Sequence, residues 1–314
     1  MKKLILGLMI ATMSTQLVGC ASEESTQKPE VTENIKETET QKETETSKEE
    51  VPQEEVEVEH RIVASSVAVV EILDRLGVSV VGVPTTQYEL PESAKSATEI
   101  GSPMSPDMEI IKSLDPTVVI SVSTLSPDLA ADFEKLGIPV QFADLSSYEG
   151  VKTTITELAA LFGKEAEAET LIADFELREE TIATTIEGKE EKEVLVMFGA
   201  PGSFMVGTET SYVGDLVKQV GGKNVIEGQE SSFIPVDMEY LVSKNPDVIL
   251  ALTHADPEAS KKMFEDEFAT NPLWENFDAV KEDKIFYLPN GYFGMSGNLQ
   301  AIDAMEILVD MLYE

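Results

Sequence analysis

The 314-residue sequence predicts an α/β fold of two lobes, each built on a mostly parallel sheet, joined by one long helix. Three observations support this fold class. A segment of helix and strand pattern occurs twice, strands alternate with helices on both sides of it, and an uninterrupted helical stripe lies between the two halves.

The repeated segment begins at Asp107 and returns at Asp237, 130 residues later. Each copy predicts a short helix begun by its Asp and ended before Pro116 or Pro246, followed by a buried β-branched strand. Solenoid repeats recur every 20–50 residues or so. Two copies this far apart therefore predict the same substructure in each of two lobes, and such a chain invites a ligand into the cleft between them.

Strands and helices alternate through both halves. In the first half we expect strand 61–64, helix 67–76, strand 78–83, the repeat helix, strand 118–121, helix 126–137 and strand 139–143. In the second half we expect strand 194–198, helix 212–220, the second repeat helix and its strand to residue 252, and a terminal helix 299–312. This alternation predicts Rossmann-like lobes with helices on the faces of a largely parallel sheet.

One long helix is expected between the halves. Residues 164–186 contain no glycine or proline, and their apolar side chains form one helical stripe. A helical connection of this length permits small rocking of the lobes but resists the wide closure that flexible strands allow.

The first 19 residues predict a signal peptide, with Lys2 and Lys3 ahead of an apolar run. The run is too short for a transmembrane helix. Leu17-Val-Gly-Cys20 resembles the bacterial lipobox, whose cysteine is diacylated, and Cys20 is the only cysteine of the chain. An ordinary signal peptide with a chance cysteine is the alternative. We expect lipidation of Cys20 and attachment to the cell membrane on its extracytoplasmic face.

An acidic segment follows the cysteine. Residues 21–59 contain 14 Glu and 4 Lys and no aromatic residue, which predicts a disordered tether. The expected organisation is therefore a signal peptide, a lipidated tether, a first lobe, a connecting helix and a second lobe, over residues 1–19, 20–59, 60–163, 164–190 and 191–314. The net charge of −36 argues against nucleic acid as a partner.

Several short stretches, in this order, carry a resemblance to a known family. They are Arg61-Ile-Val, Val67-Ala, Val81-Gly with Pro84-Thr, Gly101-Ser-Pro-Met-Ser-Pro-Asp, Pro201-Gly-Ser, Ser211-Tyr-Val-Gly-Asp-Leu-Val, Gly221-Gly-Lys-Asn-Val-Ile, Lys262-Met-Phe, Phe277-Asp-Ala-Val-Lys and Phe293-Gly-Met-Ser-Gly-Asn. Residues 60–314 resemble the helical-backbone substrate-binding proteins of ABC importers, and within them the haem-binding lipoprotein of the iron-regulated surface determinant system.

The resemblance implies a membrane-anchored receptor that captures haem b between its lobes. It also implies three partners. These are the haem itself, the cell-surface protein that donates it, and the ABC permease of a haem importer that receives it.

Two residues of different lobes match the family's iron ligands. His254 follows the expected strand 248–252, in a loop at the carboxyl end of a strand, where open α/β sheets bind ligands. Met104 lies between Pro103 and Pro106, which should hold the backbone extended. Considered alone, such residues are more often a bystander and a packing side chain. The resemblance implies that both coordinate haem iron.

Five further residues are expected to contact the haem propionates. Two serines precede the helix at Val67, so the free amides of Val67 and Ala68 form an anion-binding helix start, although ordinary capping predicts the same sequence. Thr86, Gln87 and Tyr88 form the second group. The family has a tyrosine directly after its Ser or Thr, whereas here Gln87 takes that position and Tyr88 follows.

Glu109 and Glu239 are the equivalent acids of the repeat. In the family such a pair, one acid from each lobe, docks onto arginines of the permease. Solvated helix charges are the alternative for either residue alone.

Other functions find less support in the sequence. Ferric siderophores need arginines at the cleft, and the three arginines, Arg61, Arg75 and Arg178, lie elsewhere. Cobalamin remains an alternative cargo, and a bare zinc or manganese ion would need clustered histidines. The chain has none of the common catalytic or nucleotide-binding motifs, so we do not expect an enzyme.

Overall fold

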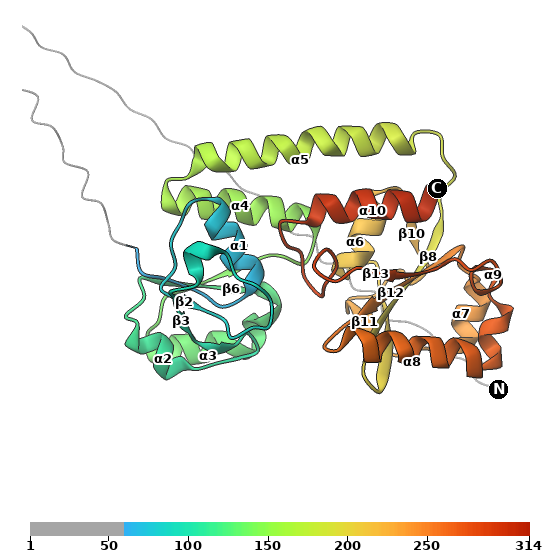
Figure 1. Cartoon of the computed structure of the whole chain (residues 1–314), viewed down its shortest axis with the longest axis horizontal. Helices are drawn as coiled ribbons and strands as arrows, with labels where there is room; N and C mark the ends of the chain where they lie inside the picture. The colour runs from blue at the N-terminus through green and yellow to red at the C-terminus, as the bar shows by residue number, and fades with distance from the viewer. Residues whose placement is uncertain (1–59) are drawn as a thin grey trace, which may run out of the picture. The chain divides into compact units, whose positions relative to one another are not determined.

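The computed structural model describes residues 60–314 (Figure 1). The expected signal peptide, Cys20 and acidic tether lie outside the described residues. Within residues 60–314, no helix is long and apolar enough to cross a membrane.

The first lobe is a parallel sheet of five strands in the order β3-β2-β1-β6-β7. Its strands are β1 Ile62–Ala64, β2 Gly82–Val83, β3 Thr98–Glu99, β6 Val118–Val122 and β7 Val140–Ala143. Its connecting helices are α1 Val67–Arg75, α2 Met108–Ser113 and α3 Ser126–Leu136. A small hairpin, β4 Gly101–Ser102 with β5 Ser105–Pro106, precedes α2, and two 3₁₀ turns cover Glu92–Ala94 and Ser123–Leu125.

The strand expected over residues 78–83 is shorter than the sequence suggests. Only Gly82 and Val83 form β2. The amide of Val78 instead donates to the carbonyl of Leu73, which closes the end of α1, so the first residues of the apolar run terminate a helix.

The second lobe is a mixed sheet in the order β11-β9-β8-β12-β13, with β10 paired to β8. Its strands are β8 Glu193–Ala200, β9 Ser203–Gly207, β10 Lys223–Asn224, β11 Phe233–Ile234, β12 Val248–Thr253 and β13 Ile285–Leu288. Its helices are α6 Tyr212–Gln219, α7 Met238–Lys244, α8 Pro257–Thr270, α9 Asp278–Lys281 and α10 Ala301–Tyr313, with a 3₁₀ turn at Pro272–Asn276. The strands β9 and β11, absent from the sequence prediction, add an antiparallel edge.

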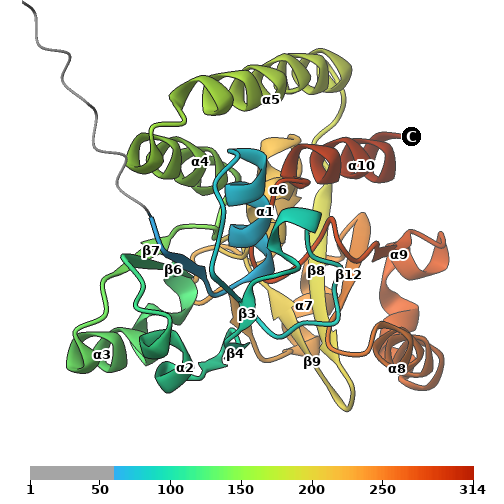
Figure 2. The ribbon, with the colours of Figure 1, turned by 60° about the vertical axis from the view of Figure 1, so that its left-hand side comes forward.

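The long helix is α5, Glu165–Ile186, and it follows the prediction closely. It packs on α4, Tyr148–Phe162, which belongs to the first lobe, and on α10 of the second lobe (Figures 1 and 2). Helix α4 is not among the elements predicted from the sequence. The fold class, two lobes with mostly parallel sheets joined by one spanning helix, is confirmed.

The largest hydrophobic cluster runs through both lobes. It joins strand residues of the first sheet, such as Ile62 and Ile120, to Val194 and Leu250 of the second sheet through the buried faces of α4, α5, α6 and α10. Phe175 is the buried aromatic that α5 contributes to this cluster. Two smaller clusters, one in each lobe, pack the opposite face of each sheet. The lobes therefore share one core on the side of the molecule that α5 covers.

The repeat has the same local structure in both lobes. The carboxylate of Asp107 accepts from the amides at the start of α2, and that of Asp237 accepts from the amide of Tyr240 at the start of α7. Asp115 and Asn245, 130 residues apart, both adopt a left-handed backbone, with φ of 47° and 44°. Short polar residues tolerate this conformation best among non-glycine residues, which explains their place just before the two prolines.

Candidate functional site

The candidate site is built from loops at the carboxyl ends of the strands. Strands β1, β2, β3 and β6 are parallel, so the segments that follow them leave the first sheet at one edge. The start of α1, the loop after β2 and the β4–β5 hairpin all lie at this edge, and they carry the site residues expected in the first lobe. His254 follows β12 at the corresponding edge of the second sheet.

Met104 lies at the turn of the β4–β5 hairpin, and 78% of the residue is exposed. The prediction of an extended backbone here was wrong, because Ser102 pairs with Ser105 across a two-residue turn. Hydrogen bonds attach the hairpin to the neighbouring loop. The amide of Thr85 donates to the carbonyl of Gly101 over 2.8 Å, and its hydroxyl donates to Glu99 over 2.9 Å. The thioether is thus presented to solvent on an anchored turn.

The start of α1 offers backbone amides. The Ser66 hydroxyl accepts from the amide of Val69 over 3.3 Å. Within residues 60–314, no hydrogen bond takes the amides of Val67 and Ala68, which belong to the first turn and have no partner inside the helix. The buried Ser65 hydroxyl donates to Ser121 of β6 over 2.9 Å and fixes this turn against the sheet. The geometry suits an anionic group, although capping by Ser66 is also present.

One acidic group lies close to this helix start. Glu71 is one turn after Val67 on α1, and burial raises the pKa of its carboxyl above the ordinary value. This half-buried carboxyl is therefore protonated more easily than an exposed one.

Thr86, Gln87 and Tyr88 follow β2, with Thr86 half-buried and the other two exposed. The amide of Tyr88 donates to the Thr86 hydroxyl over 3.0 Å, which leaves the hydroxyl hydrogen available to a ligand. Tyr88 is 65% exposed, and Gln87 is exposed as well. Both side chains are therefore accessible at the edge that carries Met104.

His254 is exposed, but its backbone is held firmly. Its amide donates to the carbonyl of Gly199 over 2.8 Å, and its carbonyl accepts from the hydroxyl of Ser260 over 3.0 Å. The imidazole lies against the ring of Phe198, with centroids 5.4 Å apart. These contacts fix the position of the loop and leave the ring nitrogens, for which no hydrogen bond occurs within residues 60–314, open to a ligand.

The loop of residues 290–298 extends the same edge. The side-chain amide of Asn290 contacts the Thr253 hydroxyl at 3.4 Å, directly beside His254. From the sequence, Tyr292 and Met295 suit the wall of the cleft and ordinary packing equally well, and the structure exposes both on this loop.

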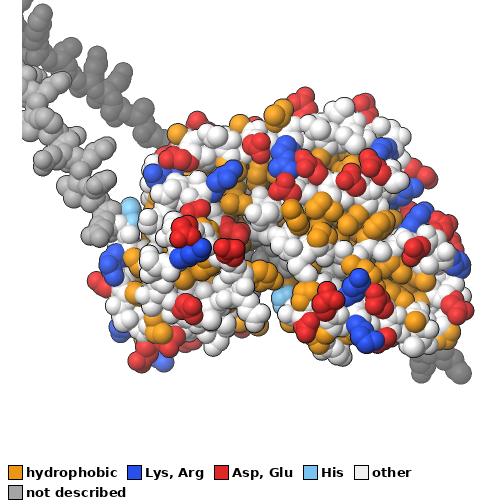
Figure 3. All heavy atoms as spheres, viewed as in Figure 1, with side chains coloured by type: hydrophobic (Ala, Val, Ile, Leu, Met, Phe, Trp, Pro, Cys, Tyr) orange, Lys and Arg blue, Asp and Glu red, His pale blue; other side chains and the backbone are white. Residues whose placement is uncertain are grey.

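Large exposed hydrophobic side chains gather at these edges. Of the eight in residues 60–314, four lie in the loops just described: Tyr88, Met104, Tyr292 and Met295. Figure 3 shows the surface hollowed between the two lobes, with hydrophobic side chains on the rim. Such a surface suits a flat apolar ligand better than a small hydrated ion. Among the described residues, no three His, Cys, Asp or Glu side chains gather as a metal site.

Two other hollows lie away from these loops. One is lined by residues 258–265 of α8. The other, lined by Lys189, Lys192, Lys284 and the C-terminal residues, lies at the opposite edge of the second sheet, where β12 begins. Neither includes a predicted site residue.

Glu109 and Glu239 are both exposed, each as the second residue of its repeat helix. Because α2 and α7 lead into β6 and β12 at the amino ends of these strands, both helices begin near the edge that carries the ligand loops. The two acids thus hold equivalent positions, one in each lobe.

The fold and these edges define a two-lobed substrate-binding protein with a helical backbone. The model of the periplasmic binding protein family matches residues 62–292, and the chain belongs to this family. It is a family of binding proteins rather than enzymes, as the sequence led us to expect.

The chain is similar to proteins of haem uptake. It is 39% identical to the high-affinity heme uptake system protein IsdE of Staphylococcus aureus, over 82% of this chain and 88% of that protein. The structure of S. aureus IsdE complexed with heme matches 82% of this chain and all of its own, with a TM-score of 0.77. An ABC transporter substrate-binding protein from Listeria monocytogenes matches equally well, at 40% identity and a TM-score of 0.77 over 99% of its length. The resemblance drawn from the sequence is confirmed.

Proposed function

We propose that this protein binds haem between its two lobes and delivers it to an ABC importer for iron acquisition. The observation that carries the proposal is the presence of an accessible thioether and an accessible imidazole, from different lobes, at strand edges rich in exposed apolar side chains. The similarity to IsdE, whose structure contains heme, supports the same cargo.

In this proposal Met104 and His254 coordinate the iron of haem b from opposite faces. A thioether with an imidazole is a ligand pair known to raise the potential of haem iron. With both axial positions taken, the iron has no open position for oxygen chemistry, which suits a carrier. The hairpin anchored by Thr85 and the loop held by Gly199 keep both ligands ready before the cargo arrives.

The propionates are assigned to the first lobe. The amides of Val67 and Ala68 supply donors without adding positive charge, and the Thr86 hydroxyl supplies another. Gln87 and Tyr88 are the candidates for the contact that a tyrosine makes in the family. We assign it to Tyr88, which presents the phenol to solvent.

The location and the partners complete the proposal. A lipidated Cys20 holds the protein on the extracytoplasmic face of the cell membrane, and residues 20–59 act as the tether. A cell-surface protein donates the haem. Glu109 and Glu239 then dock the loaded protein onto basic residues of the permease.

A competition experiment tests the cargo. The chain from residue 21 onward, which lacks the only cysteine, is titrated with haemin, cobalamin and a ferric siderophore in turn. We expect a saturable complex with one equivalent of haemin that excess cobalamin or siderophore does not displace. Saturable binding of cobalamin or siderophore, with haemin bound only nonspecifically, would replace this proposal with one of the alternative cargoes.

A further inference from the structure

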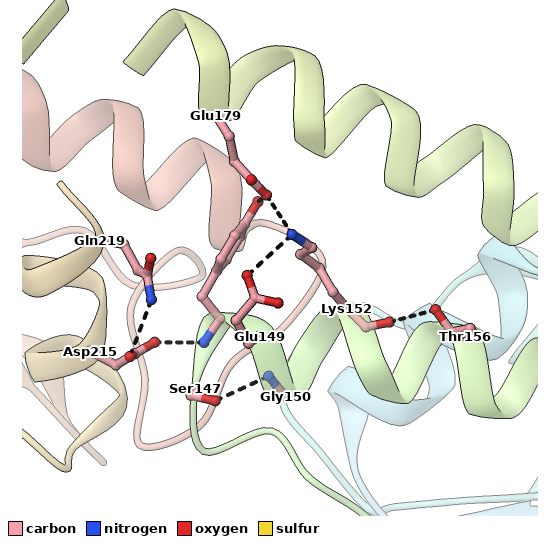
Figure 4. Close-up of polar contacts among 9 residues, drawn as sticks. Ser147, Glu149, Gly150, Lys152, Thr156, Glu179, Asp215 and Gln219 are labelled. Carbon is pink, nitrogen blue, oxygen red and sulfur yellow. Dashed lines mark hydrogen bonds and ion pairs between the residues drawn. The ribbon is translucent and has the colours of Figure 1, made fainter. Parts of the chain in front are cut away.

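A carboxylate of the second lobe caps a helix of the first lobe. Asp215 lies in the first turn of α6, and its side chain accepts from the backbone amide of Tyr148 over 2.8 Å (Figure 4). Tyr148 is the first residue of α4, so this amide has no partner inside its own helix. A carboxylate at a helix start is also stabilised by the positive end of the helix dipole.

A second contact joins the lobes nearby. The amide of Gly297, in the loop before α10, donates to the carbonyl of Leu145 in the first lobe over 2.7 Å. A Cβ atom on Gly297 would lie 2.5 Å from the Val151 side chain of α4 and 2.9 Å from the Tyr212 ring of α6. Glycine is therefore required by the close approach of the two lobes at this point.

The spanning helix fastens the same region. The Tyr148 phenol donates to Glu179 of α5 over 2.6 Å, and Lys152 of α4 pairs with the same carboxylate at 2.9 Å (Figure 4). One residue earlier on α5, Arg178 pairs with Asp303 of α10 in the second lobe. Neighbouring residues of α5 thus contact α4 of the first lobe and α10 of the second lobe.

These contacts continue to the proposed ligand loops. Gly297 belongs to the 290–298 loop, whose Asn290 contacts Thr253 beside His254. On the other side, Leu145 follows Asp144, which accepts from the Ser123 hydroxyl at the end of β6 over 3.3 Å. These hydrogen bonds between the lobes therefore connect the strand edges that carry the proposed ligands.

We propose that the Asp215–Tyr148 and Gly297–Leu145 contacts form a fulcrum that fixes the spacing between the two ligand-bearing edges. Asp215 and Gly297 are positioning residues, since neither belongs to the proposed cargo contacts. The fulcrum acts without cargo, and only its effect on haem release rests on the proposed function.

The test measures the distance between the lobes. Spin labels are placed on Glu134→Cys of α3 and Glu265→Cys of α8, both exposed, in the chain from residue 21 onward, which has no other cysteine. Pulsed electron paramagnetic resonance then gives the distance distribution without cargo. The variants are Asp215→Ala, Asp215→Asn and Gly297→Ala, and Asp237→Ala is the control, because it removes a carboxylate–amide bond inside one lobe.

We expect Asp215→Ala to broaden the distribution and to speed haem dissociation roughly tenfold, as for the loss of one charge-assisted hydrogen bond. Asp215→Asn keeps an acceptor and should retain the narrow distribution. Gly297→Ala should displace the mean distance, which gives a second readout if Asp215→Ala fails to fold. Asp237→Ala should lower stability without changing the distance.

Two outcomes separate this inference from the proposed function. Unchanged distributions in both Asp215→Ala and Gly297→Ala overturn the fulcrum. If Asp215→Ala broadens the distribution while the unsubstituted protein binds no haemin, the fulcrum is supported and haem is refuted as the cargo.

Discussion

The ring of Phe198 lies against the imidazole of His254, with centroids 5.4 Å apart and planes inclined by 37°. Phe198 is on β8, and His254 directly follows the neighbouring strand β12, whose Leu252 pairs with Phe198. Phe233 of β11 packs on Phe198 in turn, at 4.8 Å. The proposed iron ligand is therefore oriented by the aromatic residues of adjacent strands.

We expect Phe198→Ala to weaken haem binding by up to about tenfold, because an aromatic contact contributes roughly 0.5–1.5 kcal/mol. It should also lower the free energy of unfolding by about 2 kcal/mol, less than for a fully buried ring. Haemin titration and urea unfolding measure the two effects. Phe268→Ala removes a half-buried ring that packs on Trp274, and it should lower stability without changing affinity. Equal losses of haem affinity in Phe198→Ala and Phe268→Ala would contradict the role of Phe198 in orienting His254.

Gly214 has no room for a side chain. Its Cβ would lie 2.1 Å from the carbonyl oxygen of Thr208, which the Ser211 hydroxyl also contacts. Gly214→Ala should therefore lower the free energy of unfolding by about 2–3 kcal/mol through overpacking. Gly228→Ala meets no atom within 4 Å, and its positive φ of 73° should cost only about 1 kcal/mol. Chemical denaturation measures both losses. A larger loss of unfolding free energy in Gly228→Ala than in Gly214→Ala would refute the overpacking expected at Gly214.

Asp144 should contribute a pH-dependent term to stability. Hydrogen bonds from the side chain and amide of Ser146 hold the pKa of the Asp144 carboxyl below its ordinary value. A depressed folded-state pKa stabilises the protein above the unfolded-state pKa, and this stability is lost as the pH falls through the folded-state pKa.

Asp144→Asn should accordingly reduce stability at pH 7, and its difference from the unsubstituted protein should disappear as the pH falls from about 5 through the acid range. Unfolding curves recorded across that range measure the difference. Asp132→Asn, on the exposed face of α3, is the control. A difference that persists undiminished at the acid end would rule out this linkage.

The paired acids should act in delivery and not in capture. We expect Glu109→Lys with Glu239→Lys to abolish haem uptake by cells while haemin binding in solution stays unchanged, because the substitutions oppose the basic residues of the permease. Glu134→Lys with Glu265→Lys reverses two exposed acids elsewhere and serves as the control. Normal haem uptake by cells that carry Glu109→Lys with Glu239→Lys would show that these acids do not dock onto the permease.

The repeat made the two lobes predictable, because helix caps and buried strands are local signals. Asp107 and Asp237 begin their helices as expected, and α5 follows its apolar stripe. Helix α4 was missed although its signals are local: Ser147 caps it, Gly163 ends it, and its buried residues Val151, Ile155 and Leu158 recur at helical spacing. The short strand β9 was missed because its pairing depends on β8.

The candidate site was predictable in part. The position of His254 after a buried strand is a rule of the fold, and the structure has it there. The hairpin at Met104 was not predictable, because two prolines indicate an extended chain and only the pairing of Ser102 with Ser105 shows the turn. The junction at Asp215 required the structure, since its partner Tyr148 is 67 residues away in sequence.

The most direct test of the account is the absorption spectrum of the haemin complex in the unsubstituted protein, Met104→Ala, His254→Ala and the double variant. We expect a six-coordinate spectrum at one equivalent, an altered spectrum in each single variant, and loss of the specific complex in the double variant. Identical spectra in all four proteins would contradict ligation of haem by one residue from each lobe.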